Sequence, residues 1–226
     1  MIRKILFSII IFLTALAYAG AVEPYFCTRQ GARLRYVRTD AGDGTIVWRH
    51  TMSIDEVSGN GNGSTVGYSS LFTKANGGRM YGGPVALNAS IDGDGKVTMS
   101  VAESLASVFA NVVGARNVRQ EGGVTILPSD MKPGDVLPDI TGSASAGPLK
   151  ITVSVTDRKV LREETLKTPA GTFECVVVQE HKVEKGVRNR VTTARTWYAR
   201  GVGMVRHDTY DKNMKLDTSE VLQAID

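Results

Sequence analysis

The three histidines are the side chains of this sequence best suited to acid–base or metal chemistry. His50, His181 and His207 do not fall at the i, i+4 spacing of a helical zinc site. Asp208 follows His207 directly, and adjacent residues of a strand point to opposite faces, so these two cannot form the orienting pair of a Ser-His-Asp triad. The sequence also lacks a Gly-x-Ser-x-Gly nucleophile motif. We therefore predict no catalytic residue, no metal site and a protein that is not an enzyme.

The two cysteines, Cys27 and Cys175, allow one disulfide if the chain is exported. Closing a loop of about 150 residues would stabilise the fold by up to about 5 kcal/mol. Each cysteine could instead be a small buried hydrophobe, and the sequence leaves both alternatives open. Cys175 is a poor candidate nucleophile because it lies in an apolar run, residues 173–178, where burial raises the pKa of a thiol.

Two further motifs resemble binding loops but fit turns better. Asp92-x-Asp94-Gly95 has Lys96 at the third ligand position of a calcium loop and Val97 where the loop needs glycine, so we expect a hairpin turn. The glycine-rich segment 59–64 resembles a phosphate cradle only in its glycine content, and we expect a flexible loop. No cofactor is predicted.

The N-terminus has the features of a cleavable signal peptide. Arg3 and Lys4 precede an apolar run of about 15 residues, shorter than the roughly 20 that a membrane span needs. The run leads into Ala17-Tyr18-Ala19, and we expect cleavage after Ala19, with Ala21 as the alternative. The signal peptide would then be residues 1–19, and residues 20–226 would form one exported, periplasmic domain without a membrane span.

The charge of the chain gives little indication of a partner. Removal of Arg3 and Lys4 lowers the formal charge from +4 to +2. The mild basic excess of residues 157–207, eleven Lys or Arg against six Asp or Glu, is typical of the solvated face of strands. We therefore predict no nucleic-acid partner.

Alternation with a period of two dominates the sequence and predicts strands. Turn residues at 40–44 and 92–95 predict hairpins that join 33–39 to 45–53 and 85–91 to 97–101. Apolar residues at helical spacing predict one helix at 102–114, ended by Gly114.

The second half continues this pattern. Small residues at 142–148 predict a loop, and 150–156 and 158–167 are interpreted as separate strands. Glu180, Lys182 and Glu184 are expected to face water. The fold class is therefore mainly β: a curved antiparallel sheet or half-open β-barrel with one short helix, in a single domain.

Two sequence blocks carry a family resemblance. Leu127-Pro-x-x-Met-x-Pro-Gly-Asp-x-Leu-Pro-Asp139 is the first, and the second combines Thr168-Pro-Ala-Gly-Thr-Phe-x-Cys175 with Thr196-Trp-Tyr-Ala-x-Gly-Val-Gly-Met-Val205. Over residues 25–222 the chain resembles TapB-like exported proteins of Gram-negative bacteria. Such families look like distant relatives of LolA- and LolB-type carriers, whose curved sheet and helical lid enclose an apolar cavity. By this fold analogy a LolA-like fold is expected, and no catalytic residue is implied.

Two hypotheses for function follow. The first is a non-enzymatic periplasmic protein that binds a lipid, another apolar ligand or a lipidated client in a cavity of the barrel, under the helix. That cavity would be lined by Trp48, Met52, Met99 and Trp197. The second is a cell-envelope interaction module with a filled core, which binds another protein or a glycan through a sheet edge or a basic face.

Overall fold

The computed structural model describes residues 22–226 except 61, 115–116 and 187–188. The predicted signal peptide, 1–19, and both predicted cleavage positions lie outside the described residues. No helix in the described part of the chain is long and apolar enough to cross a membrane.

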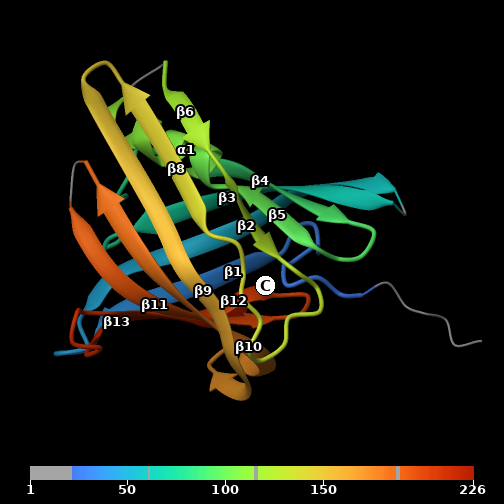
Figure 1. The fold of residues 1–226 in the computed structure, drawn as a ribbon. Helices are drawn as coiled ribbons and strands as arrows, with labels where there is room; N and C mark the ends of the chain where they lie inside the picture. Colours follow the sequence, from blue (N-terminus) through green and yellow to red (C-terminus); the bar gives the residue numbers. More distant parts are fainter. Residues whose placement is uncertain (1–21, 61, 115–116, 187–188) are drawn as a thin grey trace, which may run out of the picture.

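The described chain forms thirteen strands and one helix (Figure 1). Their bounds are β1 Arg33–Asp40, β2 Ile46–Asn60, β3 Gly63–Thr73, β4 Val85–Asp92, β5 Val97–Ser100, α1 Val101–Val113, β6 Arg119–Gly122, β7 Val124–Leu127, β8 Ile140–Ala146, β9 Leu149–Thr168, β10 Gly171–Lys185, β11 Arg190–Ala199, β12 Gly203–Tyr210 and β13 Leu216–Ile225.

All thirteen strands belong to one antiparallel sheet, in the order β6-β8-β9-β10-β11-β12-β13-β1-β2-β3-β4-β5-β7. The two edge strands, β6 and β7, are consecutive in the chain and are separated only by Gly123. The sheet therefore curls until its edges meet at this glycine, and it is nearly closed and barrel-shaped (Figure 1). The prediction of a mainly β, curved antiparallel sheet is confirmed.

Short polar turns set the register of the predicted hairpins. The Asp40 carboxylate accepts a hydrogen bond from the Gly42 amide at 2.7 Å, and Gly44 has a φ of +73°, which favours glycine. At the next predicted turn Asp92 accepts from the amides of Asp94 and Lys96, and φ of Gly95 is +79°. Both predicted hairpins, β1–β2 and β4–β5, are confirmed.

The predicted helix is also confirmed, as α1. The Ser100 hydroxyl caps its first turn by accepting from the Glu103 amide at 3.1 Å, and Gly114 ends it with a φ of 67°. Its Val101 and Leu105 pack on an apolar group of β8 and β9, made up of Ile140, Val153 and Val155. The helix therefore covers the part of the sheet next to the seam between its edges (Figure 1).

Close packing by this helix explains one wrong prediction. Residues 142–148 were expected to form a small-residue loop, but 140–146 form β8. A Cβ atom added to Gly142 would lie 3.0 Å from Val101 Cγ1 and 3.4 Å from Leu105 Cδ1. Position 142 holds a glycine because the helix approaches the strand closely there.

Three other predictions for strands and loops are corrected. The hydrogen-bonded pairing of β2 with β3 continues almost to the turn. Residues 59–60 therefore belong to β2 and residues 63–64 to β3, and not to a flexible loop. The two strands expected at 150–156 and 158–167 are one, β9, which stays paired with β10 through a bulge where Asp157 has a φ of 53°. Two strands that were not predicted, β6 and β7, form the sheet edges.

One end of the barrel is filled by apolar side chains. Tyr25 and Phe26, which precede β1, and Met131 and Leu137, from the segment between β7 and β8, belong to a single buried cluster with side chains of the sheet. Leu34, Val160, Val205 and Leu222 are fully buried there. We call this the closed end.

Candidate binding site at the open end of the sheet

A row of polar side chains crosses the inner face of the sheet. Residues paired directly across strands share a face, and the pairings Trp48–Arg38, Arg38–Glu220, Glu220–His207 and His207–Thr196 therefore place five side chains in one row. Neighbouring rows on the same face hold Tyr36, His50, Phe72 and Leu222. Polar and aromatic side chains thus replace the apolar packing of the closed end.

Arg38 and Glu220 form a buried ion pair within the row. Their side chains are 8% and 6% exposed, and Arg38 Nη1 lies 3.4 Å from Glu220 Oε2. Arg38 also donates to the Thr218 hydroxyl at 2.8 Å and to the Thr209 hydroxyl at 3.2 Å. Most of the guanidinium therefore has partners, which is what a charge buried away from water requires.

His50 connects this pair to a serine. Its Nδ1 lies 3.1 Å from Glu220 Oε1 and its Nε2 lies 3.1 Å from Ser70 Oγ. Burial alone would raise the pKa of Glu220, but the hydrogen bond from His50 and the electrostatic attraction of His50 and Arg38 outweigh burial and lower it. Glu220 is therefore a carboxylate at neutral pH.

The His50 ring lies between two aromatic rings. Tyr36 stacks on it with ring centres 5.2 Å apart, and Phe72 stacks at 4.3 Å. Phe72 in turn meets Trp48 and Tyr81 edge to face. The indole N–H of Trp48 is buried and has no protein acceptor, so an oxygen atom of a ligand could accept from it.

His207 is the second histidine of the row. Its Nδ1 lies 2.8 Å from Thr196 Oγ1. Burial, and then the positive charge of Arg38, lower the pKa of His207 to about 4, so its ring is neutral at pH 7. The third histidine, His181, pairs with Thr193 on the opposite face of the sheet.

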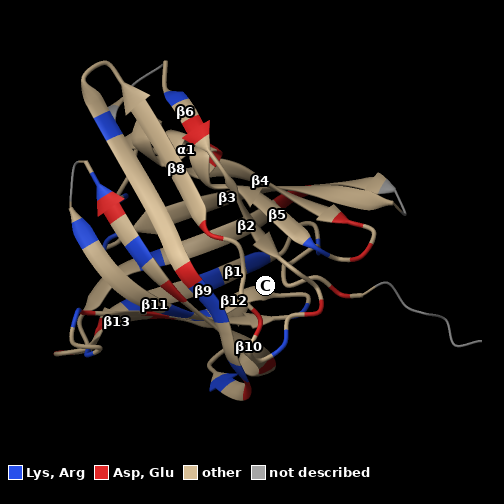
Figure 2. Cartoon of the chain, viewed as in Figure 1, with Lys and Arg blue, Asp and Glu red and all other residues tan. Residues whose placement is uncertain are grey.

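Solvent reaches the inner face at the other end of the barrel. Lys182 pairs across the sheet with Val155, and Glu184 with Val153, on the face where those valines contact the helix. Lys182 and Glu184 form an ion pair of 2.7 Å and keep 37% and 29% of their side chains exposed. We call this the open end, and Figure 2 shows charges of both signs on the strands around it. Lys182 and Glu184 were expected to face water, and their partial exposure agrees with this, although they lie on the inner face of the sheet.

A third ion pair lies deeper on the same strands. Arg158 is 1% exposed and donates to the Pro138 carbonyl at 3.0 Å. Its Nε lies 3.5 Å from Glu180 Oε2. Glu180 was also expected to face water, but the bulge at Asp157 places the buried Arg158 beside it.

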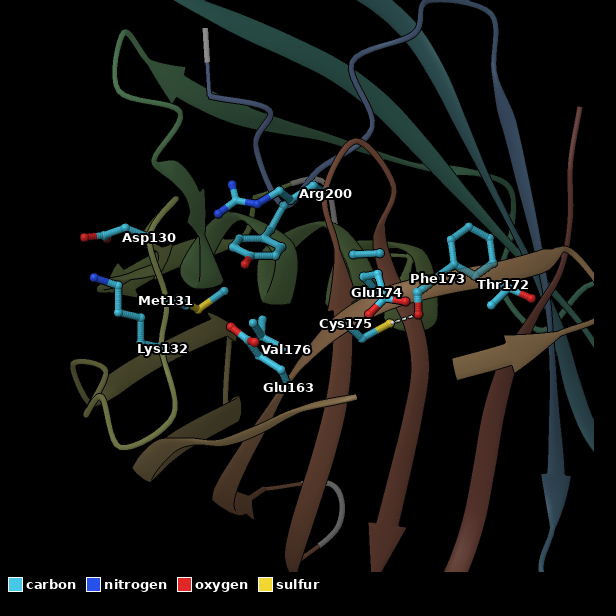
Figure 3. A pocket seen from close by; sticks show the side chains of 12 residues that line it. Asp130, Met131, Lys132, Glu163, Thr172, Phe173, Glu174, Cys175, Val176 and Arg200 are labelled. Carbon is cyan, nitrogen blue, oxygen red and sulfur yellow. Dashed lines mark hydrogen bonds between the residues drawn. The ribbon is translucent and has the colours of Figure 1, made fainter. Parts of the chain in front are cut away.

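A pocket of about 580 Å³ lies outside the sheet interior, at the tip of the β9–β10 hairpin (Figure 3). Tyr25, Met131, Phe173 and Val176 give it apolar walls, and its lining also carries charges of both signs. Arg200 is held in place because it donates to the carbonyls of Glu23 and Ser129 and lies over the Tyr25 ring at 4.7 Å.

The structure brings together some of the predicted cavity residues. Trp48 and Met52 lie on the inner face of β2, and Met52 packs on the main apolar cluster. Met99 of β5 packs on the same cluster and accepts a hydrogen bond from the Tyr68 hydroxyl. Trp197 pairs with Arg206, on the face opposite to Thr196, and lies between the guanidinium groups of Arg162 and Arg206. It is therefore not beside Trp48.

Cys27 and Cys175 are both buried and are not joined to each other. Cys175 lies in the wall of the outer pocket. Burial, followed by the negative charges of Glu164 and Glu174, raises the pKa of its thiol to about 12. A thiol with this pKa is protonated at neutral pH and reacts slowly.

Sequence reasoning missed Ser70, Arg38 and Glu220, which surround His50. They lie on β3, β1 and β13, and Glu220 is 170 residues away from His50 in the sequence. The one available signal was the placement of charged residues at positions where the alternation predicts inward-facing side chains. Among the residues that the structure describes, no three His, Cys, Asp or Glu side chains group as metal ligands would.

The match to a protein family covers most of the sequence, residues 29–222, and therefore includes nearly the whole sheet. The chain belongs to the DUF3108-like family. No curated protein sequence matches it. The resemblance to TapB-like proteins and the analogy with LolA- and LolB-type carriers remain predictions.

Two solved structures share the fold of this DUF3108-like protein. One is a protein from Bacteroides fragilis with a YmcC-like fold, predicted to be exported; it is 23% identical, with a TM-score of 0.73. The other is a predicted lipoprotein from Parabacteroides distasonis, 21% identical, with a TM-score of 0.74. Each match covers 90% of this chain and 99% of the other.

Proposed function

We propose that this protein is exported to the periplasm, where it binds an amphipathic ligand at the open end of its sheet. The observation that carries the proposal is the exposure of the inward-facing ion pair Lys182–Glu184, because solvent reaches the inner face beside it. A lipid or a lipidated client has the required combination of an apolar chain and a polar group. The two structural neighbours, one predicted to be exported and the other predicted to be a lipoprotein, support the location.

The chemistry of the inner face supports an amphipathic ligand over a purely apolar one. Val101 and Leu105, which are only partly buried against the valines of β9, offer apolar surface beside the ion pair. The aromatic rings of Trp48 and Phe72 offer flat apolar contacts, while the unpaired indole N–H of Trp48 offers one hydrogen bond. Holding such a ligand requires no catalytic group.

The outer pocket favours a second candidate function, docking of another envelope protein. β10 pairs with β11 only from Cys175 onward, whereas its residues 171–174 pair with β9 alone. This part of the strand lines the pocket with Thr172 and Phe173. An extended peptide could add to such an edge by main-chain hydrogen bonds. The protein would then act as an interaction module whose closed end is filled by its own side chains.

Native mass spectrometry of the protein purified from the periplasm tests the first proposal. We expect a reproducible one-to-one adduct, which denaturing extraction then identifies as a lipid or another amphiphile. Trp48→Phe, which removes the indole N–H, should weaken retention of the adduct. Val47→Ala is the matched control because Val47 precedes Trp48 on β2 and is exposed. An apo mass for the wild-type protein would contradict ligand binding and favour the interaction module.

A further inference from the structure

Three side chains of the inner face form a chain of hydrogen bonds that no sequence motif indicates. Ser70, His50 and Glu220 are joined in that order, through His50 Nε2 and His50 Nδ1, at 3.1 Å each. A hydroxyl, an imidazole and a carboxylate in this order are the parts of a serine nucleophile with its base and the group that orients the base. Such constellations are recognised by geometry and occur on unrelated folds.

The ionised carboxylate fixes the direction of the hydrogen bond at His50 Nδ1. A carboxylate only accepts, so His50 must carry its proton on Nδ1 and donate it to Glu220. A base must have a free ring nitrogen, and with its single proton on Nδ1 the His50 ring accepts at Nε2 a hydrogen bond from the Ser70 hydroxyl. This is the arrangement in which a histidine can take the proton of a serine that attacks a substrate.

The surroundings of His50 also suit a base that becomes charged during a reaction. The Tyr36 and Phe72 rings lie nearly parallel to it, at 19° and 9°, and prevent it from turning. Aromatic faces attract a cation, so this sandwich would stabilise the imidazolium. The Tyr36 hydroxyl is itself fixed by donation to the Met204 carbonyl at 2.9 Å, and Arg38 helps to hold the Glu220 carboxylate.

We propose that Ser70 is a nucleophile that accepts an acyl group from an ester, with His50 as its base and Glu220 as a positioning residue. Ser70 Oγ forms a bond to the carbonyl carbon while its proton passes to His50 Nε2. The tetrahedral intermediate then releases the alcohol, which takes that proton from His50 as the ester C–O bond breaks. Water attacks the acyl-serine with His50 again as the base, and a carboxylic acid and free Ser70 are formed.

This activity goes beyond the proposed ligand binding, because binding needs neither Ser70 nor His50 to react. Ser70 is 6% exposed and the His50 side chain is 11% exposed, and both lie on the inner face, so an ester would have to approach them from the inside of the sheet. The substrate class is therefore an ester whose carbonyl end enters the barrel, such as a short acyl ester or the ester end of a bound amphiphile.

Covalent labelling with a small fluorophosphonate, read by intact mass and peptide mapping, tests the proposal on the full exported protein. We expect one label on the wild type, mapped to Ser70, and slow hydrolysis of 4-nitrophenyl acetate. Ser70→Ala should abolish both. His50→Gln should slow labelling by about 100-fold or more, the usual contribution of a general base.

Ser69→Ala is the matched control, because Ser69 is the next residue of β3 and points to the opposite face. Glu220→Gln, which keeps the shape of the side chain, should slow labelling less than His50→Gln does. It replaces His50→Gln as the test if the His50 variant does not fold. A folded wild type without a label on Ser70, or labelling that Ser70→Ala leaves unchanged, would overturn the proposal. Native mass spectrometry reports ligand binding independently, so failure of one proposal is distinguishable from failure of the other.

Discussion

Replacing Arg38 with methionine removes one partner of the buried ion pair and leaves the other in place. Glu220 would keep its hydrogen bond to His50 but would lose the guanidinium 3.4 Å away. The Thr209 and Thr218 hydroxyls would also lose a donor, although they would keep their own contact at 2.7 Å. Methionine has a similar length, so the change acts mainly on charge and hydrogen bonding.

The expected loss of stability follows from the burial of the pair. Breaking a buried ion pair by removing one partner costs about 3–5 kcal/mol, because the other charge is left uncompensated. For a domain of this size each kcal/mol lowers the Tm by about 2–4 °C, so the expected decrease is about 6–20 °C. Arg38→Met combined with Glu220→Leu should cost less than the sum of the two single changes, because no buried charge then remains unpaired.

Urea denaturation followed by circular dichroism measures these free energies of unfolding. Arg35→Met is the matched control, since Arg35 lies on the same strand and its ion pair with Asp226 is about half exposed. That pair should contribute less than about 1 kcal/mol. If Arg38→Met lowers the free energy of unfolding by less than about 1 kcal/mol, the argument that the ion pair is buried is refuted. If the double variant loses as much free energy as the two single variants added together, the argument that Arg38 and Glu220 are coupled is refuted.

Three further predictions concern the seam, the buried histidine and the buried thiol. Gly142→Val should destabilise by about 1–3 kcal/mol in urea denaturation, because the added atoms collide with α1, whereas Ser143→Val on the other face should have little effect. His207 binds a proton more weakly when folded, with a pKa near 4 against 6.5, so the free energy of unfolding should fall by on the order of 3 kcal/mol as the pH drops from about 6.5 to 4. His207→Gln should flatten this slope, and an unchanged slope would contradict the assignment. Cys175, with its raised pKa, should react with iodoacetamide at pH 8 far more slowly in the folded protein than in urea, and equal rates would show that the thiol is accessible.

Local features of the sequence predicted much of the fold. The alternation and the Asp-Gly turns gave β1–β2 and β4–β5, and the helical spacing with Gly114 gave α1. These predictions succeeded because each depends on residues a few positions apart. The strand β8 could not be predicted in the same way, because its Gly142 reflects the approach of a helix from elsewhere in the chain.

The candidate site was less predictable than the fold. Trp48 lies on the inner face, whereas Trp197 lies on the other face, because the register of β11 with β12 decides which residues turn inward. Ser70, His50 and Glu220 meet only because β3, β2, β1 and β13 are neighbours in the sheet. That order is a property of the whole topology, and sequence spacing does not contain it.

The most direct test of ligand binding uses the two tryptophans of the chain, Trp48 and Trp197. Trp197→Phe leaves only the inner tryptophan, and Trp48→Phe leaves only the one on the outer face. Each variant is titrated with an amphiphile whose acyl chain carries bromine, which quenches tryptophan fluorescence on contact. Binding at the open end predicts saturable quenching when only Trp48 remains and little change when only Trp197 remains. Quenching of Trp197 alone, or of neither tryptophan, would contradict the proposed site.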